Sequence, residues 1–424
     1  MRWLSVTCFA FSLLAGVLGE SESCHSADWQ AFRGPNGDGV APDKTVPLRW
    51  GPAQNIKWRF ELPGPGNSSP IVSNGRVFVT CATEDGKHRR LYCLDRASGK
   101  LLWVRDVVWE NPEPTHKTNP YCGSTPVADG QRVVVWHGSA GVWCYDFEGR
   151  TIWNRDLGEV GHVWGYGSSP IILDGKVLLN FGPGVDSFLA ALDLQTGQLV
   201  WKTDEPGGAN QREPRMVGSW STPLVVSVDG QRQVVCSMPS RVVAYDPGTG
   251  RIIWTCGGLP SPRGDLVYTS VLTSGRTGVA MGGYKGPAMG FRLGGRGDVT
   301  QQNRLWRVEA NQPQRIGSGV IVDGYIFVAN AGPGTYQCLE LSTGKEQWVK
   351  RLPGDHWGAV VFAAGHLFVT NQNGQTRVLR PSPEKFDLVS TNDLQEPSNS
   401  TPAISDSQLF LRTFQAVYCV AEEP

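Results

Sequence analysis

Residues 93–103 read CLDRASGKLLW, and four further segments repeat this pattern of a small residue, an acidic residue, a glycine and a tryptophan. They are CYDFEGRTIW at 144–153, which is one residue shorter, ALDLQTGQLVW at 191–201, AYDPGTGRIIW at 244–254 and CLELSTGKEQW at 338–348. The wider tryptophan series, at intervals of 42 to 53 residues, comprises Trp58, Trp103, Trp153, Trp201, Trp254, Trp306 and Trp348. A pattern that recurs at this period over most of the 424 residues predicts one structural unit repeated along a single domain.

Each position of the segment has a structural explanation. The acidic residue ends a strand, and its carboxylate can accept hydrogen bonds from N–H groups of the following turn. The glycine supplies the positive φ that closes the hairpin, and the tryptophan offers a large apolar surface to a neighbouring unit. Because catalysis needs a single convergent site, carboxylates found in every repeat are expected to form turns. Besides the tryptophans, these structural positions are Asp95, Gly99, Asp146, Asp193, Gly197, Asp246, Gly250 and Gly344.

A second pattern, Ser-Ser-Pro or Ser-Thr-Pro, lies upstream of the hairpins. It occurs at 68–70, 124–126, 168–170, 221–223 and 400–402, with divergent forms at 268–270, 317–319 and 357–359. Each unit then reads as four antiparallel strands, of which the last carries the tryptophan, and this is the composition of a propeller blade. Eight openings and seven tryptophan strands, with an imperfect eighth around 385–389, predict eight blades and about 32 strands.

The order of strands predicts how the ring closes. The chain starts with a lone tryptophan strand at 56–62 and ends after 417–420 with no such strand following. The first strand is therefore expected to complete the last blade, which removes exposed sheet edges. We predict an all-β, eight-bladed propeller over 56–424, preceded by a leader at 20–55 and a signal peptide at 1–19.

The first residues resemble an export signal. Arg2 precedes an apolar run over 3–18, and cleavage is expected after Gly19. Sixteen apolar residues are short for a membrane span, although a retained anchor helix is the alternative. Lipid attachment at Cys24 is disfavoured, because the acidic Glu22 lies where a small residue is needed. We expect an exported protein without an integral membrane span.

The ten cysteines do not predict a disulfide framework, because nine remain after signal removal. Cys93, Cys144, Cys338 and Cys419 occupy a position that alanine fills in two other repeats, as expected for a small buried apolar site. A bond between Cys81 and Cys93, on neighbouring predicted strands, remains an alternative. The charge balance of 39 basic and 39 acidic residues argues against binding to nucleic acid or to an anionic membrane surface. We expect a monomer.

The hairpin [Ala/Cys]-x-Asp-x-x-[Ser/Thr]-Gly-x-x-x-Trp resembles the tryptophan-docking motif of pyrroloquinoline-quinone-type (PQQ-type) propellers over about residues 56–420, and the leader at 28–39 resembles the opening of exported bacterial PQQ-repeat proteins. The resemblance implies that the exported protein belongs to the bacterial envelope, periplasmic or secreted, and that it falls into one of two classes. Quinoprotein dehydrogenases hold PQQ and usually calcium and oxidise alcohols or sugars. Non-catalytic members include the propeller scaffold of the outer-membrane barrel-assembly machinery. This chain lacks the adjacent cysteine pair and haem appendage of many dehydrogenases, and it matches none of their calcium-ligand or base motifs.

A binding site is expected where the loops that join each tryptophan strand to the next blade gather around the channel. Aromatic and basic side chains there would suit a planar or anionic ligand, although polar loops with aromatic side chains closing the channel are the alternative. Tyr284 and Lys285 lie on another loop of the same predicted face. The candidate residues are His116, Lys117, His162, Trp164, Tyr166, Arg212, Arg215, Trp220, Arg263, Tyr268, Arg315, His356 and Trp357.

Among functions, the sequence favours a non-catalytic binding or scaffold module whose partners are envelope proteins or a small planar or anionic ligand. The alternatives are a PQQ- and calcium-dependent dehydrogenase and a carbohydrate-binding propeller. No catalytic residue is predicted. No metal site is predicted either, because His116, His162 and His356 lack ligand spacing.

Overall fold

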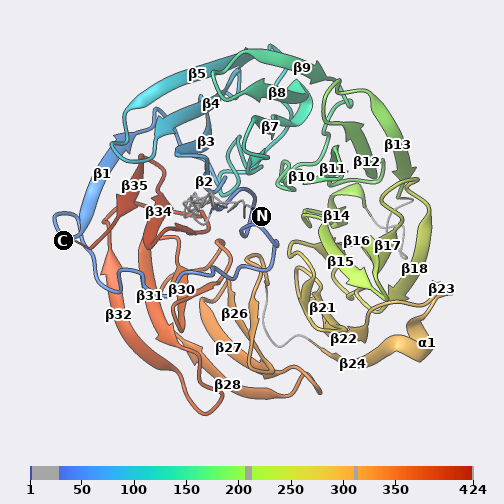
Figure 1. The fold of residues 1–424 in the computed structure, drawn as a ribbon. Helices are drawn as coiled ribbons and strands as arrows, with labels where there is room; N and C mark the ends of the chain where they lie inside the picture. The colour runs from blue at the N-terminus through green and yellow to red at the C-terminus, as the bar shows by residue number, and fades with distance from the viewer. Residues whose placement is uncertain (2–27, 206–212, 310–313, 423–424) are drawn as a thin grey trace.

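The computed structural model, which describes residues 1, 28–205, 213–309 and 314–422, is a ring of eight four-stranded antiparallel blades (Figure 1). The predicted fold class and blade number are confirmed. Apart from Met1, the predicted signal peptide lies outside the described residues, as do Cys24 and Arg212. Within the described part of the chain, no helix has the length and apolar character needed to cross a membrane.

The first four blades follow one another along the chain, each with its strands in order from the channel outward. Blade 1 contains β2 (Ile71–Ser73), β3 (Arg76–Ala82), β4 (His88–Asp95) and β5 (Leu101–Val108). Blade 2 contains β6 (Val127–Ala128), β7 (Arg132–Trp136), β8 (Val142–Asp146) and β9 (Thr151–Arg155). Blade 3 contains β10 (Ile171–Leu173), β11 (Lys176–Phe181), β12 (Phe188–Asp193) and β13 (Leu199–Asp204). Blade 4 contains β15 (Leu224–Val228), β16 (Gln231–Ser237), β17 (Arg241–Tyr245) and β18 (Ile252–Gly257).

The remaining blades complete the ring. Blade 5 contains β20 (Leu272–Ser274), β21 (Thr277–Met281), β22 (Ala288–Arg292) and β24 (Arg304–Val308). Blade 6 contains β25 (Val320–Val322), β26 (Tyr325–Asn330), β27 (Thr335–Glu340) and β28 (Glu346–Arg351). Blade 7 contains β29 (Val361–Ala363), β30 (His366–Thr370), β31 (Gln375–Arg380) and β32 (Asp387–Asp393). Blade 8 contains β33 (Ala403–Ser405), β34 (Gln408–Arg412), β35 (Ala416–Val420) and β1 (Ile56–Glu61).

Three short strands and the described helices lie outside the four-stranded pattern of the blades. β14 (Val217–Ser219) pairs in parallel with β19 (Asp265–Val267), and β23 (Gly297–Asp298) adds to the outer edge of β18. The described helices are α1 (Thr300–Asn303) and two single-turn 3-10 segments, Gly138–Ala140 and Pro214–Met216.

In six of the eight blades, the tryptophan of the outer strand docks onto the next blade. Trp153 Nε1 donates to the carbonyl of Leu194 at 2.9 Å, and Leu194 directly follows the turn residue Asp193. The indole also covers Gly197, where an added Cβ would lie 2.5 Å from the ring. The same indole-to-carbonyl bond joins Trp58 to Arg96, Trp103 to Phe147, Trp201 to Pro247, Trp306 to Leu341 and Trp348 to Ser382. The repeated glycine therefore makes room for the neighbouring tryptophan as well as closing its own hairpin.

The acidic residue and the small residue of the motif behave as predicted. Asp95 accepts hydrogen bonds from the hydroxyl and the N–H of Ser98, which lower the pKa of its carboxyl. Cys93 lies opposite Trp103 in the sheet, and Ala191 lies opposite Trp201, so the position has to be small. All eight described cysteines are buried and free. The alternative of a Cys81–Cys93 disulfide is wrong, because Cys81 pairs with Arg90 in the sheet and Cys93 with Phe78.

One tryptophan departs from the pattern. Trp254 is fully buried, and its indole N–H bonds to Gln233 Oε1 at 2.8 Å within its own blade. The turn of blade 5 that would receive it is enlarged by β23 and α1, and β23 pairs along Trp254 instead. The imperfect eighth strand is confirmed as β32, where Ser390 takes the place opposite Val378 that tryptophan occupies elsewhere.

Hydroxyl groups of the second sequence pattern link the innermost strands at six of the eight junctions between described blades. Ser69 N donates to Thr125 Oγ1 at 2.9 Å, Thr125 N to Ser169 Oγ at 3.0 Å, and Ser169 N to Thr222 Oγ1 at 3.0 Å. Equivalent bonds run from Ser270 to Ser318, from Ala359 to Thr401 and from Thr401 back to Ser69. Because the Ser/Thr hydroxyl of one blade accepts the N–H of the blade before it, the repeated hydroxyl is a junction between blades.

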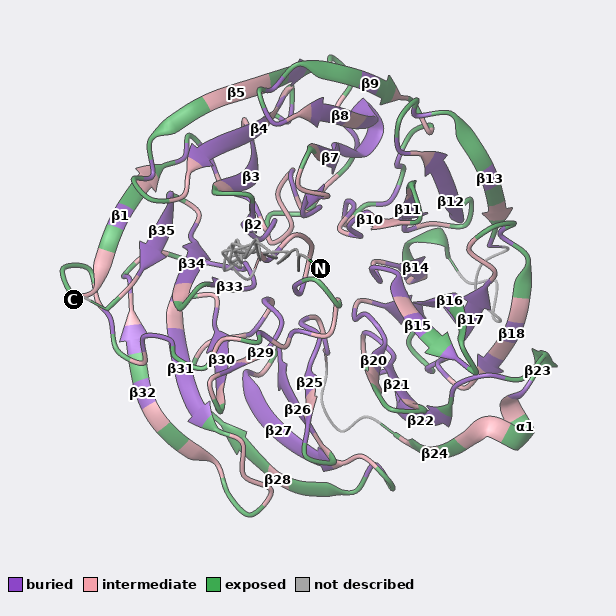
Figure 2. Cartoon of the chain, in the orientation of Figure 1, coloured by how far each residue is buried: buried purple, intermediate pink, exposed green. Residues whose placement is uncertain are grey.

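The ring closes as the order of strands predicted. β1 pairs with β35, and Trp58 of this strand docks onto blade 1. The hydrophobic cores lie between neighbouring blades, where buried residues of facing sheets interdigitate. Figure 2 shows this arrangement as buried residues in the middle strands and exposed residues along the outer strands.

The described leader crosses the central channel (Figure 1). Trp29 forms a two-way backbone bridge with Val72 of blade 1, and Gly39 and Ala41 bond to Phe362 of blade 7. Val72 lies three residues after the junction residue Ser69, and Phe362 lies three residues after Ala359. The leader therefore contacts the innermost strands beyond the junctions, on the side away from the loops that lead into these strands.

Docking of Trp153 onto Gly197 predicts an unequal pair of glycine substitutions in blade 3. Gly197 and Gly175 have the same positive φ, 68° and 69°, but an added Cβ at Gly175 meets nothing within 4 Å. Gly175→Ala should cost about 1–2 kcal/mol from backbone strain alone, and Gly197→Ala about 2–4 kcal/mol because the indole must also move. Urea unfolding followed by circular dichroism measures the difference, and equal losses would contradict the docking role.

Candidate functional site

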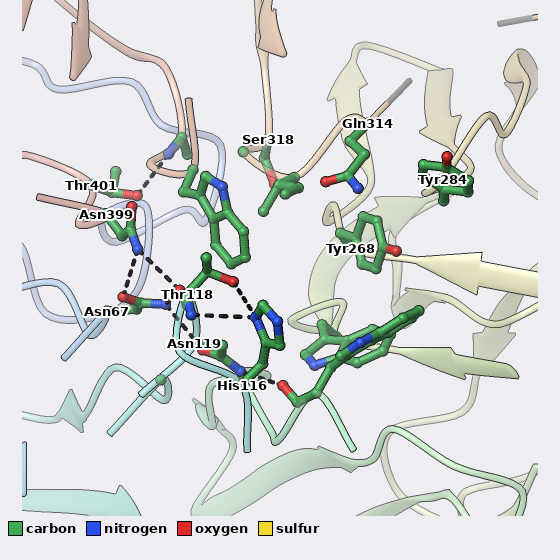
Figure 3. A pocket seen from close by; sticks show the side chains of 18 of the residues that line it. Asn67, His116, Thr118, Asn119, Tyr268, Tyr284, Gln314, Ser318, Asn399 and Thr401 are labelled. Carbon is green, nitrogen blue, oxygen red and sulfur yellow. Dashed lines mark hydrogen bonds between the residues drawn. The ribbon is translucent and has the colours of Figure 1, made fainter. Parts of the chain in front are cut away.

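A cavity of about 470 Å³ lies at the centre of the ring, on the face formed by the loops between blades. Its volume falls within the range of roughly 300–1,000 Å³ that is usual for small-molecule pockets. Figure 3 shows Asn67, Asn119 and Asn399 gathered on one side, with Tyr268 and Tyr284 across from them.

The same repeat position of all eight blades lines this cavity. It is the residue two before each junction position, at the point where the chain enters the innermost strand. In blade order these residues are Asn67, Gly123, Gly167, Trp220, Tyr268, Ile316, Trp357 and Asn399. The architecture is therefore uniform, and the side chain at one repeated position decides the chemistry of each sector.

Glycine at two of these positions leaves space that longer loops occupy. Gly123 and Gly167 belong to blades 2 and 3, and His116, Asn119 and Trp164 line the cavity from the loops that precede these glycines. An added Cβ at Gly123 would lie 2.6 Å from the carbonyl oxygen of Tyr166, so a side chain there would displace the adjoining loop. These loops bring polar and aromatic groups next to each other.

Three asparagines form the polar side. Asn67 Nδ2 donates to Thr118 O at 3.1 Å and to Asn119 Oδ1 at 3.0 Å, and Asn399 Nδ2 donates to Asn67 Oδ1 at 3.1 Å. Asn119 Nδ2 bonds to the carbonyls of Trp164 and Tyr166. Each amide oxygen has two lone pairs, so these oxygens keep accepting capacity while their N–H groups hold the loops together.

Aromatic rings form the opposite side. The Trp164 and Trp220 ring centroids are 6.3 Å apart, and Tyr268 meets Trp220 edge-on at 5.2 Å. Trp220 Nε1 donates to Gly165 O at 3.0 Å, which fixes this ring against the loop of blade 3. His162 lies behind the two tryptophans, edge-on to Trp220 at 5.0 Å.

The described lining carries no Asp, Glu, Lys or Arg side chain. Of the thirteen residues predicted from sequence, the structure brings five together in the lining: His116, Trp164, Trp220, Tyr268 and Trp357. Tyr284 joins them, whereas Lys285 does not. The prediction was a lining that combines aromatic and basic side chains. The described cavity has the aromatic side chains, and His116 is its one basic side chain.

The remaining predicted residues lie elsewhere. Lys117 and Arg263 are exposed outside the lining, and Arg215 is an exposed partner of Glu213. Arg315 is buried and donates to Gly286 O at 2.9 Å, and burial lowers its pKa to about 10. His356 is also buried. Its Nδ1 lies 3.0 Å from Asn330 O and its Nε2 lies 2.8 Å from Tyr336 Oη, so the neutral ring donates through Nδ1.

Tyr166 supports the cavity from behind. Its hydroxyl lies 3.4 Å from Arg89 Nη1, and Arg89 forms a two-point ion pair with Glu113 at 3.1 and 2.9 Å. Both partners are buried, and Tyr121 lies against the guanidinium, whose carbon is 4.2 Å from the ring centroid. The pair joins blade 1 to the loop that carries His116.

Asn67, Asn119, Gln314, Ser318, Asn399 and Thr401 are lining residues that the sequence analysis did not single out. The second repeat pattern contained the missing signal, since Asn67 and Asn399 each directly precede its first serine. The lining follows the register of the repeat, so many chemically conspicuous loop residues, such as Lys117 and Arg263, lie outside it.

The fit of PQQ and calcium can be judged from the donor set. PQQ is a tricarboxylate, which needs cationic or multiple N–H donors, and calcium needs several oxygen ligands that include carboxylates. The described lining offers neither an arginine or lysine nor a carboxylate, and the N–H groups of its asparagines are already bonded. No group of three or more His, Cys, Asp or Glu in the described chain is placed to hold a metal. The described residues therefore do not fit this cofactor pair.

Three buried histidines predict that stability falls in mild acid. Burial lowers the pKa of His137 to about 3 and those of His162 and His356 to about 4, below the unfolded value of about 6.5. The unfolded chain binds more protons between these values, so stability is full above pH 6.5 and declines toward pH 4, by up to about 1.4 kcal/mol per unit for each histidine. Urea midpoints against pH measure the slope. His137→Phe should make the slope of the urea midpoint against pH shallower, and an unchanged slope in this variant would contradict the assignment.

The buried ion pair predicts a large effect of neutralising one partner. Glu113→Gln leaves the Arg89 charge uncompensated and should cost about 3–5 kcal/mol. Glu148→Gln removes a pair with Arg76 of similar length, 3.2 Å, whose carboxylate is 60% exposed, and should cost less than about 1 kcal/mol. Thermal or urea unfolding compares the variants. Similar losses of stability in the two would show that the buried pair contributes no more than the exposed pair.

Comparisons with known proteins give two groups of relatives. The sequence matches the family described as "Outer membrane protein assembly factor BamB" over residues 53–107, 87–289 and 295–384. Quinohemoprotein alcohol dehydrogenase ADH IIB of Pseudomonas putida is 24% identical over 82% of this chain and 53% of its own length. BamB of Moranella endobia is 24% identical over 47% of this chain and 46% of its own length. The chain thus spans about half the length of these curated relatives.

Solved structures show the same two groups. BamB from Moraxella catarrhalis superposes with a TM-score of 0.61 at 14% identity, covering 86% of this chain and 99% of that one. Quinohemoprotein alcohol dehydrogenase from Comamonas testosteroni superposes with a TM-score of 0.64 at 11% identity, covering 94% and 81%. At these identities the likeness establishes the propeller fold and leaves the activity to the residues of the site.

Proposed function

The chain belongs to the PQQ-repeat propeller family described as outer membrane protein assembly factor BamB, and from this premise we propose that it is a non-catalytic binding module of the bacterial envelope. In this proposal the ring is a rigid support and the central cavity holds a small uncharged ligand. The apolar run over 3–18 supports export, with residues 1–19 as the signal peptide, 20–55 as the leader and 56–424 as the propeller.

The uncharged lining carries the proposal. Oxidation of an alcohol requires a base that takes the hydroxyl proton within hydrogen-bond reach of the substrate. No carboxylate lines the described cavity, and the Nδ1 of His116 lies 2.7 Å from the hydroxyl of Thr118. The repeat carboxylates, such as Asp95 and Asp193, are bonded into turns at the far ends of their strands. This set of side chains therefore supports the binding of a ligand without a catalysed reaction.

A quinoprotein dehydrogenase is the second candidate. The match to the Pseudomonas putida alcohol dehydrogenase over 82% of the chain favours it. That function would need carboxylates and cationic groups to hold calcium and the quinone, and the described lining provides none. Envelope-protein partners, which the name of the matched family suggests, are compatible with a binding module whose outer surface contacts other proteins.

Titration with PQQ and calcium tests the proposal. The purified protein should show no saturable quenching of tryptophan fluorescence by PQQ at tens of micromolar, about −6 kcal/mol on the affinity scale, and no dehydrogenase activity with an artificial electron acceptor. Gln314→Arg places a guanidinium in the lining and should increase PQQ binding, which shows that the assay detects an anion in this cavity.

Saturable, calcium-dependent quenching of the unmodified protein, together with oxidation of an alcohol or a sugar, would overturn the proposal in favour of the dehydrogenase. Quenching by Gln314→Arg alone would support it.

A further inference from the structure

We propose that the central cavity binds a neutral saccharide, with a sugar ring stacked on its aromatic side and hydroxyl groups bonded to its asparagines. This inference rests on the proposed function, because it names the ligand class of the same non-catalytic site. It follows from three properties of the lining: its division into an apolar and a polar side, its hydrogen-bonding capacity and its lack of charge.

The division of the cavity matches the two surfaces of a sugar ring. A pyranose has a face of C–H groups and an edge of hydroxyls, and C–H groups are attracted to the electron-rich face of an aromatic ring. Trp164, Trp220, Tyr268, Tyr284 and Trp357 supply aromatic surface. Figure 3 shows Asn67, Asn119 and Asn399 across the cavity from Tyr268 and Tyr284. A purely apolar ligand would leave the second lone pair of each amide oxygen without a donor, so it would use only the aromatic part of the lining.

The remaining hydrogen-bonding capacity includes both donors and acceptors. Asn67 Oδ1, Asn119 Oδ1 and Asn399 Oδ1 each accept one hydrogen bond and keep a second lone pair. Ser318 Oγ and Thr401 Oγ1 accept the N–H of Ser270 and of Ala359, and within the described chain neither hydroxyl proton has an acceptor. Since each sugar hydroxyl both donates and accepts, it can use both kinds of group.

The charge of the lining separates saccharides from other ligands that aromatic rings attract. An anionic sugar would need an arginine or lysine, and the described lining has none. A quaternary ammonium ion also stacks on aromatic rings, but it cannot accept the hydroxyl protons of Ser318 and Thr401. A neutral polyol is the ligand class that uses both sides of the cavity.

Phe32 of the leader also lines the cavity, and it lines a second cavity on the far side of the leader. The leader therefore separates the two spaces within the channel. This placement favours a short saccharide or the end of a longer one, because a chain passing through the channel would meet the leader.

The test starts with an array of neutral and acidic glycans and continues with fluorescence titration of the saccharides that bind. Glucuronic acid, choline and PQQ with calcium serve as charged comparison ligands. We expect saturable binding of at least one neutral saccharide and none of glucuronic acid or choline. Trp357→Ala should weaken this binding at least about tenfold, because a stacking surface is lost.

The matched control is Trp109→Ala. Trp109 and Trp357 are both partly exposed loop tryptophans, but Trp109 lies outside the lining and bonds to Asn111 O. Unchanged saccharide affinity in Trp109→Ala, with weaker binding in Trp357→Ala and the same unfolding midpoint in both, supports the inference. Equal saccharide affinity in both variants would mean that the saccharide binds outside the central cavity, and it would overturn the inference.

Other outcomes separate this inference from the proposed function. Absence of neutral-saccharide binding, with no response to PQQ, overturns the saccharide inference and leaves a binding module with another ligand. Choline binding in place of saccharide overturns the ligand class in the same way. Binding of PQQ with calcium to the unmodified protein, accompanied by turnover, overturns both proposals.

Discussion

The contact between a tryptophan of one blade and a glycine of the next is the constraint on which the whole ring depends. The indole N–H bonds to a carbonyl in the neighbouring turn, and the indole ring occupies space that any side chain at the glycine would fill, as Trp153 does over Gly197. Six of the eight blades are thereby fixed to the next at the outer rim, while the hydrophobic cores fill the space between sheets. Closure by β1 applies the same contact at the last junction, through Trp58.

The inner rim is fixed by a second repeated contact, in which a hydroxyl accepts the N–H of the preceding blade. These junctions place the residue two positions earlier at the wall of the cavity in every blade. Because stability depends on the docking and junction positions, the lining position is free to vary from blade to blade. As a result, two asparagines, Asn67 and Asn399, are neighbours at one part of the wall, and two aromatic residues, Trp220 and Tyr268, are neighbours at another.

The sequence predicted the fold closely, because the motif is local. Asp193, Gly197 and Trp201 lie within one hairpin, and their spacing alone specifies the turn and the docking strand. The candidate site was predicted only in part. His356 and Arg315 have the chemistry of ligand-binding residues, yet packing turns both into the protein interior. Asn67 and Asn399, 332 residues apart, looked unremarkable, and they became neighbours only through ring closure.

By itself, the sequence determined the number of blades, the order of their strands and the closure of the ring, since these follow from a repeated local pattern and from where that pattern begins and ends. Tertiary structure decided which side chains meet at the centre. Eight residues from eight blades converge there, and whether a loop residue such as His116 or Lys117 joins them depends on how its loop packs against its neighbours. Such convergence is set by contacts distant in sequence, so the uncharged character of the described cavity emerged only from the folded ring.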